Sequence, residues 1–210
     1  MKANKVFSTD GLFYTVTAKI FDLFVICVYW LVGCIPVITI GTSFSAMYNT
    51  VVNVIRNNNS SVTPMFWKTY KRDFKASLPL TLFFLGILFV LLLNFGIVRQ
   101  FITNLFGLFL LVLYLFLALL VVTAANYAVC LLSRFNMPFR WIIQMSFYMT
   151  VRYLPCSIVI LALFLISYVL LMVQPYFFFI VPAAATLIVS FLTEPILKLH
   201  IKEEPNHEIH

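Results

Sequence analysis

Three polar residues within apolar stretches of the chain are the first candidates for chemistry. Asp22 and Glu194 are the acids there, and Asn126 is the most deeply placed uncharged polar residue. Charged groups inside membrane spans are costly and often mark ion or substrate pathways. Both acids lie near the end of their apolar run, and Lys198 follows Glu194 at the helical pairing distance of four residues. We therefore predict structural pairing for the acids and a helix–helix hydrogen bond for Asn126.

No pattern of residues typical of an active site occurs in the sequence. The chain lacks the H-E-x-x-H, G-x-S-x-G and Walker motifs. Its three histidines lie in a polar cytoplasmic tail, residues 198–210, together with three glutamates: His200, His207, His210, Glu203, Glu204 and Glu208. A solvated tail accounts for these residues better than a metal site does. We expect no enzymatic activity, no cofactor and no metal.

The composition requires a membrane environment. Of the 210 residues, 63% are hydrophobic and 10% are charged, whereas a soluble domain has about 25% charged residues. A spanning helix needs about 20 apolar residues, and four runs clearly qualify: 78–98, 105–132, 154–174 and 176–197. We predict a single all-α domain, residues 1–210, folded as a polytopic transmembrane helical bundle.

Two further segments, 18–35 and 38–55, decide the number of spans. If both cross the membrane, there are about six spans. Of the 14 Lys and Arg residues, 13 then share one side with both chain ends, and Arg99 alone lies opposite. If 38–55 is a loop, there are five spans and the basic residues divide 10 against 4. Because basic residues accumulate in the cytoplasm, the six-span topology with both ends inside is favoured.

Small residues cluster at the start of the second span. Pro36 interrupts the apolar run, and Gly41, Ser45 and Asn49 then fall four residues apart. Small residues at this spacing let helices approach closely in lipid. We predict a buried, packed helix with these packing residues: Pro36, Thr39, Gly41, Ser45 and Ala46. The alternative is that the break at 36–41 lines a cavity, where irregular backbone is tolerated at membrane depth.

The residue pattern predicts two cytoplasmic amphipathic helices, at residues 63–75 and 138–153. Thr63 and Pro64 suit a first helical turn, and aromatic residues then recur every four positions, with Lys and Arg on another face. The pattern is typical of helices on the inner membrane surface. Their aromatic residues are candidate contacts for a protein partner: Phe66, Trp67, Tyr70, Phe74 and Trp141.

The amino-terminal third resembles a known family. Trp30, the run Pro36-Val37-Ile38-Thr39-Ile40-Gly41, Ala46-Met47-Tyr48, Phe66-Trp67 and Phe74-Lys75 resemble the YesL-like family of small bacterial membrane proteins, which is defined by a domain of unknown function. The resemblance covers about residues 20–95, and P-x-x-T-x-G is its most specific part. Thr42 stands where the family usually has proline. The resemblance implies a bacterial plasma-membrane location and an association with carbohydrate ABC transporters and sensor kinases.

From these observations we expect a non-catalytic accessory subunit of a bacterial carbohydrate (oligosaccharide) ABC importer. Its partners would be the permease subunits in the bilayer, with the ATPase or the solute-binding protein as further contacts. One alternative is an independent small-solute transporter or channel, lined by residues 36–41 and Asn126. Another is a membrane regulator of a sugar-sensing two-component system. The basic residues lie between apolar runs, which argues against nucleic acid as a partner.

Overall fold

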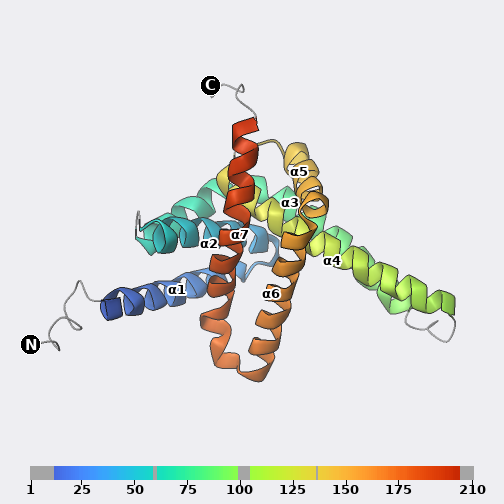
Figure 1. Ribbon diagram of the computed structural model, residues 1–210, viewed down its shortest axis with the longest axis horizontal. Helices are drawn as coiled ribbons and strands as arrows, with labels where there is room; N and C mark the ends of the chain where they lie inside the picture. The colour runs from blue at the N-terminus through green and yellow to red at the C-terminus, as the bar shows by residue number, and fades with distance from the viewer. Residues whose placement is uncertain (1–11, 59–60, 99–104, 136, 204–210) are drawn as a thin grey trace, which may run out of the picture.

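The computed structural model describes residues 12–58, 61–98, 105–135 and 137–203 (Figure 1). Every element in these ranges is helical, which confirms the all-α prediction. The α-helices are α1 (Leu12–Cys34), α2 (Ile40–Thr50), α3 (Val62–Val98), α4 (Leu105–Arg134), α5 (Phe139–Arg152), α6 (Leu154–Val173) and α7 (Val181–Glu203). Among the described residues, four helices are long and apolar enough to cross a membrane: α1, α3, α4 and α6. Helix α7 adds a shorter apolar stretch, Val181–Leu197.

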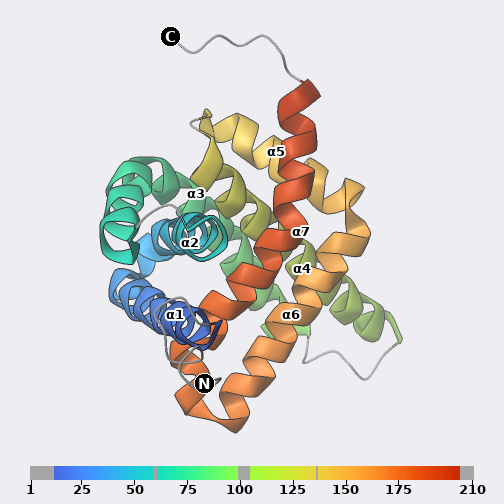
Figure 2. The same cartoon turned by 60° about the vertical axis from the view of Figure 1, so that its left-hand side comes forward.

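The segment predicted as the second span forms an interior helix. A 3₁₀ turn, η2 (Val37–Thr39), leads into α2, and a π-helical turn, η3 (Val51–Arg56), follows it. Figure 2 looks nearly along α2 and shows α1, α3 and α7 around it. Most side chains of α2 are buried, including polar ones such as Ser45 and Asn49. The prediction of a buried, packed helix is therefore confirmed.

Pro36 and Thr39 close the turn between α1 and α2. Pro36 has an extended backbone, which ends the preceding helix. The Thr39 hydroxyl lies 2.8 Å from the carbonyl oxygen of Gly33 and 2.7 Å from that of Pro36. A threonine side chain can thereby satisfy carbonyls that a helix end leaves without partners. The two helices consequently run back along each other.

Helix α3 corrects one boundary of the sequence analysis. The predicted surface helix and the following span are a single helix of 37 residues, with Pro79 inside it. Proline removes one backbone hydrogen bond and can kink a helix without ending it. The amino-terminal half of α3 is held by α2 along its length, from Thr69 to Thr81. It is therefore part of the protein interior on one side, and it is not a separate helix.

Helix α5 is the separate amphipathic helix that was predicted. It has 14 residues and begins after Pro138. Its buried residues, Ile142, Ser146, Met149 and Thr150, recur at intervals of three and four, while Arg140 and Arg152 are exposed. This spacing places one face toward the protein and leaves the basic residues outside.

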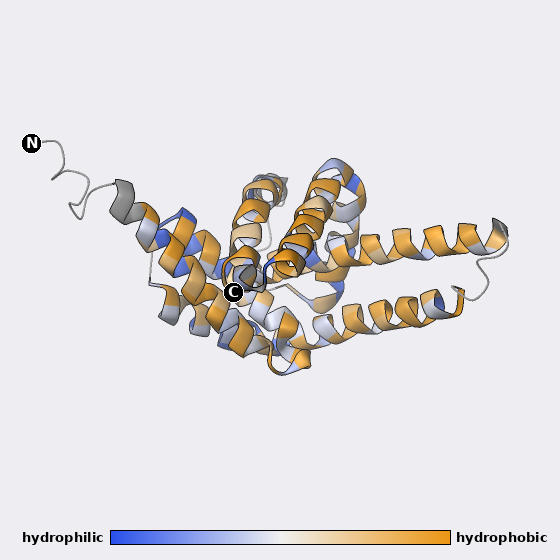
Figure 3. Ribbon diagram, turned by 90° about the horizontal axis from the view of Figure 1, so that it is seen from below, coloured by the Kyte–Doolittle hydropathy of each residue, from blue (hydrophilic) through white to orange (hydrophobic). Residues whose placement is uncertain are grey.

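Two helical hairpins give the molecule its shape. Helices α3 and α4 run side by side, and their far halves extend away from the other helices as an apolar arm (Figure 3). Helices α6 and α7 are joined by η5 (Pro175–Phe179) and cross the direction of the arm (Figure 1). Helix α2 lies beside the charged half of α3, where Lys68 and Lys75 are exposed, and not beside the apolar arm. The number of spans and the side of each chain end stay predictions.

Candidate functional site

A row of polar side chains joins α2 to the amino-terminal half of α3. Three side-chain hydrogen bonds cross between the helices, which run antiparallel: Asn49 Nδ2 to Thr69 Oγ1 at 2.7 Å, Ser45 Oγ to Asp73 Oδ2 at 2.6 Å, and Thr42 with Ser77. All six residues are buried. We call this set the polar ladder. It satisfies polar groups that would be costly in an apolar interior, so it holds the two helices in one register.

Glycine at position 41 lets the two helices approach at the end of the polar ladder. A Cβ atom on Gly41 would lie 2.1 Å from Thr81 Oγ1 and 3.3 Å from Thr81 Cβ. Gly33 on α1 has the same role, since its Cβ would lie 2.5 Å from Ser43 Oγ. The close approach is the packing role that small residues have in membrane helices.

Asp73 is the most deeply buried acid of the described residues. Its side chain is 2% exposed and accepts a hydrogen bond from Ser45. Arg72, the preceding residue, places its Nε 2.6 Å from Asp73 Oδ1. The same guanidinium donates through Nη2 to the carbonyl oxygen of Ser133, at 3.0 Å, near the end of α4. The Asp73 charge is therefore paired and hydrogen-bonded, as burial of a carboxylate requires.

Glu194 on α7 forms a second buried ion pair. Arg134 Nη2 lies 2.6 Å from Glu194 Oε1, and Arg134 Nε lies 2.8 Å from the same oxygen. The hydroxyl of Tyr48 on α2 lies 2.8 Å from Thr193 Oγ1 and 3.3 Å from Glu194 Oε1. The expected structural pairing of Glu194 is found, with Arg134 of α4 as the partner. The side chain of Lys198, which the sequence suggested, lies outside the described part.

The two ion pairs meet at the end of α4. Ser133 accepts from Arg72, and the next residue, Arg134, pairs with Glu194. Ser45 and Tyr48, less than one turn apart on α2, contact the two acids. We call these two ion pairs with their α2 contacts the ionic layer. It joins α2, α3, α4 and α7, and each acid in it already has a cation.

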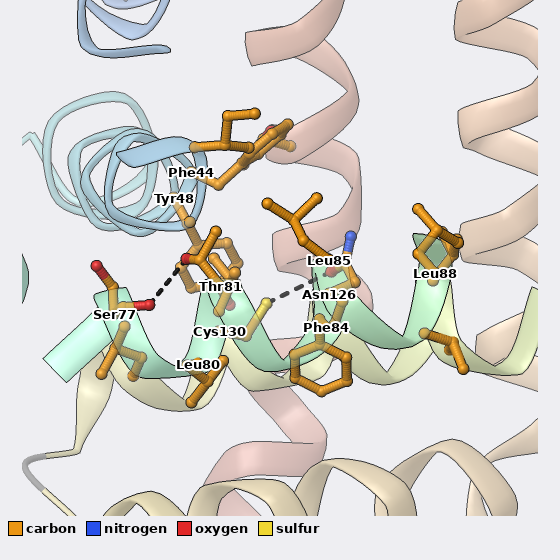
Figure 4. A pocket seen from close by; sticks show the side chains of 18 of the residues that line it. Phe44, Tyr48, Ser77, Leu80, Thr81, Phe84, Leu85, Leu88, Asn126 and Cys130 are labelled. Carbon is orange, nitrogen blue, oxygen red and sulfur yellow. Dashed lines mark hydrogen bonds between the residues drawn. The ribbon is translucent and has the colours of Figure 1, made fainter. Parts of the chain in front are cut away.

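A cavity of about 250 Å³ lies next to the polar ladder and the ionic layer (Figure 4). Helices α2, α3, α4, α6 and α7 all contribute to its wall, and most of the side chains are apolar. Gly41 and Asn126 both line it, whereas Pro36 does not. One alternative prediction was that the break at 36–41 and Asn126 line the same pathway. The cavity brings Gly41 and Asn126 together, but it does not include Pro36.

Asp22 and Trp141 lie apart from this site. Asp22 is half-buried on α1, and within the described residues it makes no hydrogen bond or ion pair. The nearby Lys19 instead donates through Nζ to the carbonyl oxygen of Ile55, at 3.0 Å. Trp141 on α5 is half-buried, and its ring centroid is 6.2 Å from that of Phe135.

The aromatic residues predicted as partner contacts divide into an inner and an outer group. Phe66 is 0% exposed and packs against Tyr29, with ring centroids 5.7 Å apart. It is not available to a partner, so that assignment is corrected for Phe66. Trp67 and Tyr70 are half-buried, and Phe74 is 37% exposed. The buried face of α3 includes Phe66, Thr69, Asp73 and Ser77, because α2 covers that side.

Most partners in the polar ladder and the ionic layer are not evident from the amino-acid sequence. Thr69, Asp73, Ser77 and Thr81 are spaced four apart, the same spacing that was noted for Gly41, Ser45 and Asn49. That repeated spacing was a signal for pairing. No comparable signal connects Arg134 to Glu194, which are 60 residues apart. In the described part of the chain, no group of three or more His, Cys, Asp or Glu residues could hold a metal ion.

The polar ladder lies in the part of the chain that matches a known protein family. Residues 23–95 match the family described as Protein of unknown function, DUF624. The match confirms the family resemblance expected over about residues 20–95. It covers about half of α1, all of α2 and nearly all of α3, so the whole polar ladder lies within it. No curated protein and no solved structure matches the chain.

Proposed function

We propose, from the resemblance of the amino-terminal third to the YesL-like family, that this chain is a non-catalytic membrane subunit of a bacterial carbohydrate ABC importer. The proposed role is lateral docking on the permease subunits. One observation carries it: the buried acids and many polar side chains of the interior pair with each other in the polar ladder and the ionic layer, while the outside of the α3–α4 arm is apolar. A protein built in this way offers surface to a partner more readily than it offers a reaction site.

The arm is the docking surface in this proposal. Large apolar side chains are exposed on both of its helices: Phe89, Val90, Leu93, Phe106, Phe109 and Val112. The arm extends beyond the rest of the molecule (Figure 3), so it can reach a neighbouring helix bundle. In lipid, helices associate through close packing and not through hydrophobic exclusion from water. Rigid aromatic side chains supply the large contact area that such packing needs.

Purification of the tagged chain in mild detergent, followed by mass spectrometry, tests the proposal. Recovery of permease subunits in a fixed ratio supports it, and recovery of a sensor kinase in their place supports the regulatory alternative. A photo-crosslinking residue at Phe109 should capture the permease. Phe21 on α1 is a matched control position, since it is 65% exposed and Phe109 is 63% exposed. Equal capture from both positions would count against docking through the arm.

Uptake measurements test the biological role. Deletion of the gene should lower oligosaccharide uptake while permease levels remain constant. A chain with Phe89, Phe106 and Phe109 replaced by leucine should remain in the membrane and restore uptake poorly. Leucine keeps the arm apolar and removes only the aromatic contact area. Unchanged uptake in the deletion strain would refute the accessory-subunit proposal.

The cavity favours a second candidate, an independent transporter of a small solute. Gly41 and Asn126 line it, whereas Pro36, which that hypothesis also included, does not. Its largely apolar wall and its volume of about 250 Å³ suit a small apolar molecule and not an oligosaccharide, which needs many hydrogen-bonding partners. The purified chain in liposomes should then release a small apolar solute without other proteins. Vesicles that retain the solute as protein-free vesicles do would exclude this candidate.

A further inference from the structure

The cavity next to the polar ladder has the size of a small ligand site. Its volume is about 250 Å³, larger than an engineered apolar cavity of roughly 150 Å³ that binds benzene. Phe44, Leu85, Leu88 and Phe164 are among the side chains of its wall. Apolar cavities of this kind are poorly suited to water and well suited to apolar molecules.

Asn126 places one amide group in this apolar wall. Its Oδ1 accepts a hydrogen bond from Cys130 Sγ, at 3.7 Å, on the same helix, so the predicted helix–helix hydrogen bond is not found among the described residues. Within the described residues its Nδ2 finds no acceptor, and Figure 4 shows the nitrogen turned away from Cys130. Asn126 is half-buried, and an amide donor that faces apolar surroundings without an acceptor is destabilising. A ligand oxygen beside Nδ2 would remove that cost.

The rim of the cavity reaches the outer surface of the candidate spans. Val122 of α4 lines the cavity and is 38% exposed, and Leu85 and Leu88 of α3 are half-buried. These residues belong to the apolar parts of helices that can cross a membrane. A ligand would therefore enter from the hydrocarbon of the bilayer. A charged molecule is disfavoured there, because charge is costly at that depth.

We propose that this cavity binds an uncharged, long-chain acyl ester that enters from the bilayer. The ester carbonyl oxygen accepts a hydrogen bond from Asn126 Nδ2, and part of the acyl chain fills the apolar wall. The amide selects for an oxygen acceptor, and the wall selects against charge. This site does not depend on a protein partner, so it can be tested on the purified chain.

Photolabelling with two matched probes tests the proposal. The probes are a diazirine-bearing fatty acid methyl ester and a diazirine-bearing hydrocarbon of the same chain length. The full chain, reconstituted in phospholipid nanodiscs, should be labelled by the ester at peptides of α3, α4 and α6 that line the cavity. One neutral hydrogen bond predicts about fivefold stronger labelling by the ester than by the hydrocarbon. Equal labelling by the two probes, or labelling confined to the arm surface, would overturn the proposal.

Two pairs of variants make the test specific. Asn126→Leu should reduce ester labelling to the hydrocarbon level. Asn94→Leu is its control, because the Asn94 side chain donates to the carbonyl oxygen of Val90 on its own helix, at 2.8 Å, outside the cavity. Ala125→Phe should fill the cavity and abolish labelling by both probes. Gly86→Phe is its control, since a Cβ there meets nothing within 4 Å.

Folding and ligand source are checked in the same preparation. Each variant must elute from size-exclusion chromatography and melt as the parent chain does. If Ala125→Phe does not fold, the comparison of ester and hydrocarbon labelling in Asn126→Leu still tests the proposal. An unlabelled long-chain ester should compete with the ester probe. Competition by a short, water-soluble ester alone would overturn entry from the bilayer.

Discussion

The hydroxyl of Ser45 donates a 2.6 Å hydrogen bond to Oδ2 of Asp73, and both side chains are buried. This bond joins α2 to α3, while Arg72 neutralises the same carboxylate and continues to α4. One serine on an interior helix therefore connects to a charge network that involves three helices. The following predictions test the contribution of these contacts to stability.

Asp73→Ala should destabilise the protein strongly. The substitution leaves Ser45 without its acceptor and Arg72 without its ion pair. Arg72 is 45% exposed and can regain water, so we expect a loss of about 2–3 kcal/mol, near the upper range for a charged hydrogen bond. Thermal unfolding in mild detergent measures it. Lys75→Ala on the exposed face of the same helix is the control and should unfold as the parent chain does.

Gly41→Ala should separate α2 from α3. The new methyl group would overlap with Thr81 Oγ1 at 2.1 Å, and overpacking of this kind costs about 1–3 kcal/mol. The double variant Gly41→Ala with Thr81→Ala should recover part of the loss, because the nearest atom is removed. Gly86→Ala is the matched control, with nothing within 4 Å of its Cβ. If both glycine variants melt alike, close packing at Gly41 is not the reason for the glycine.

The pair of Arg134 and Glu194 should behave as a coupled unit. Glu194 is buried and Arg134 is 26% exposed, so loss of Arg134 leaves a buried charge, which costs about 3–5 kcal/mol, and loss of Glu194 costs less. Arg134→Met and Glu194→Gln should each destabilise the protein, and the double variant should cost clearly less than the sum. A double-mutant cycle on unfolding free energies measures the coupling, which we expect at about 1–3 kcal/mol. Additive effects would show that the 2.6 Å contact contributes no coupling.

Phe66→Ala and Phe74→Ala should have different consequences. Phe66 is 0% exposed, so its truncation leaves a cavity and costs about 3–5 kcal/mol. Phe74 is 37% exposed, and its truncation should change stability by less than about 1 kcal/mol. Unfolding experiments compare the two directly. If both rings contacted a partner equally, both variants would be as stable as the parent chain and would lose the partner. That result would contradict the burial of Phe66.

Several elements of the fold were accessible from residue patterns, and others were not. The apolar runs predicted the long helices, because lipid leaves no other way to satisfy the backbone. Pro138 and Trp141 marked α5 correctly. The boundary predicted between residues 63–75 and 78–98 was wrong, because both segments belong to one helix with Pro79 inside it. The four-residue aromatic spacing at Phe66 also identified the wrong face of α3.

By itself, the sequence determined the all-α structure, the apolar helices long enough to cross a membrane, a close-packing role for Gly41, and the family of residues 23–95. These follow from local spacing and from the cost of an unpaired backbone in lipid. Only the tertiary structure decided that Asp73 is buried, that Arg134 pairs with Glu194, and that Gly41 and Asn126 line one cavity. Each of these contacts depends on which helices pack against each other. The spacing of residues along one helix does not reveal its partner when the two helices are far apart in the chain.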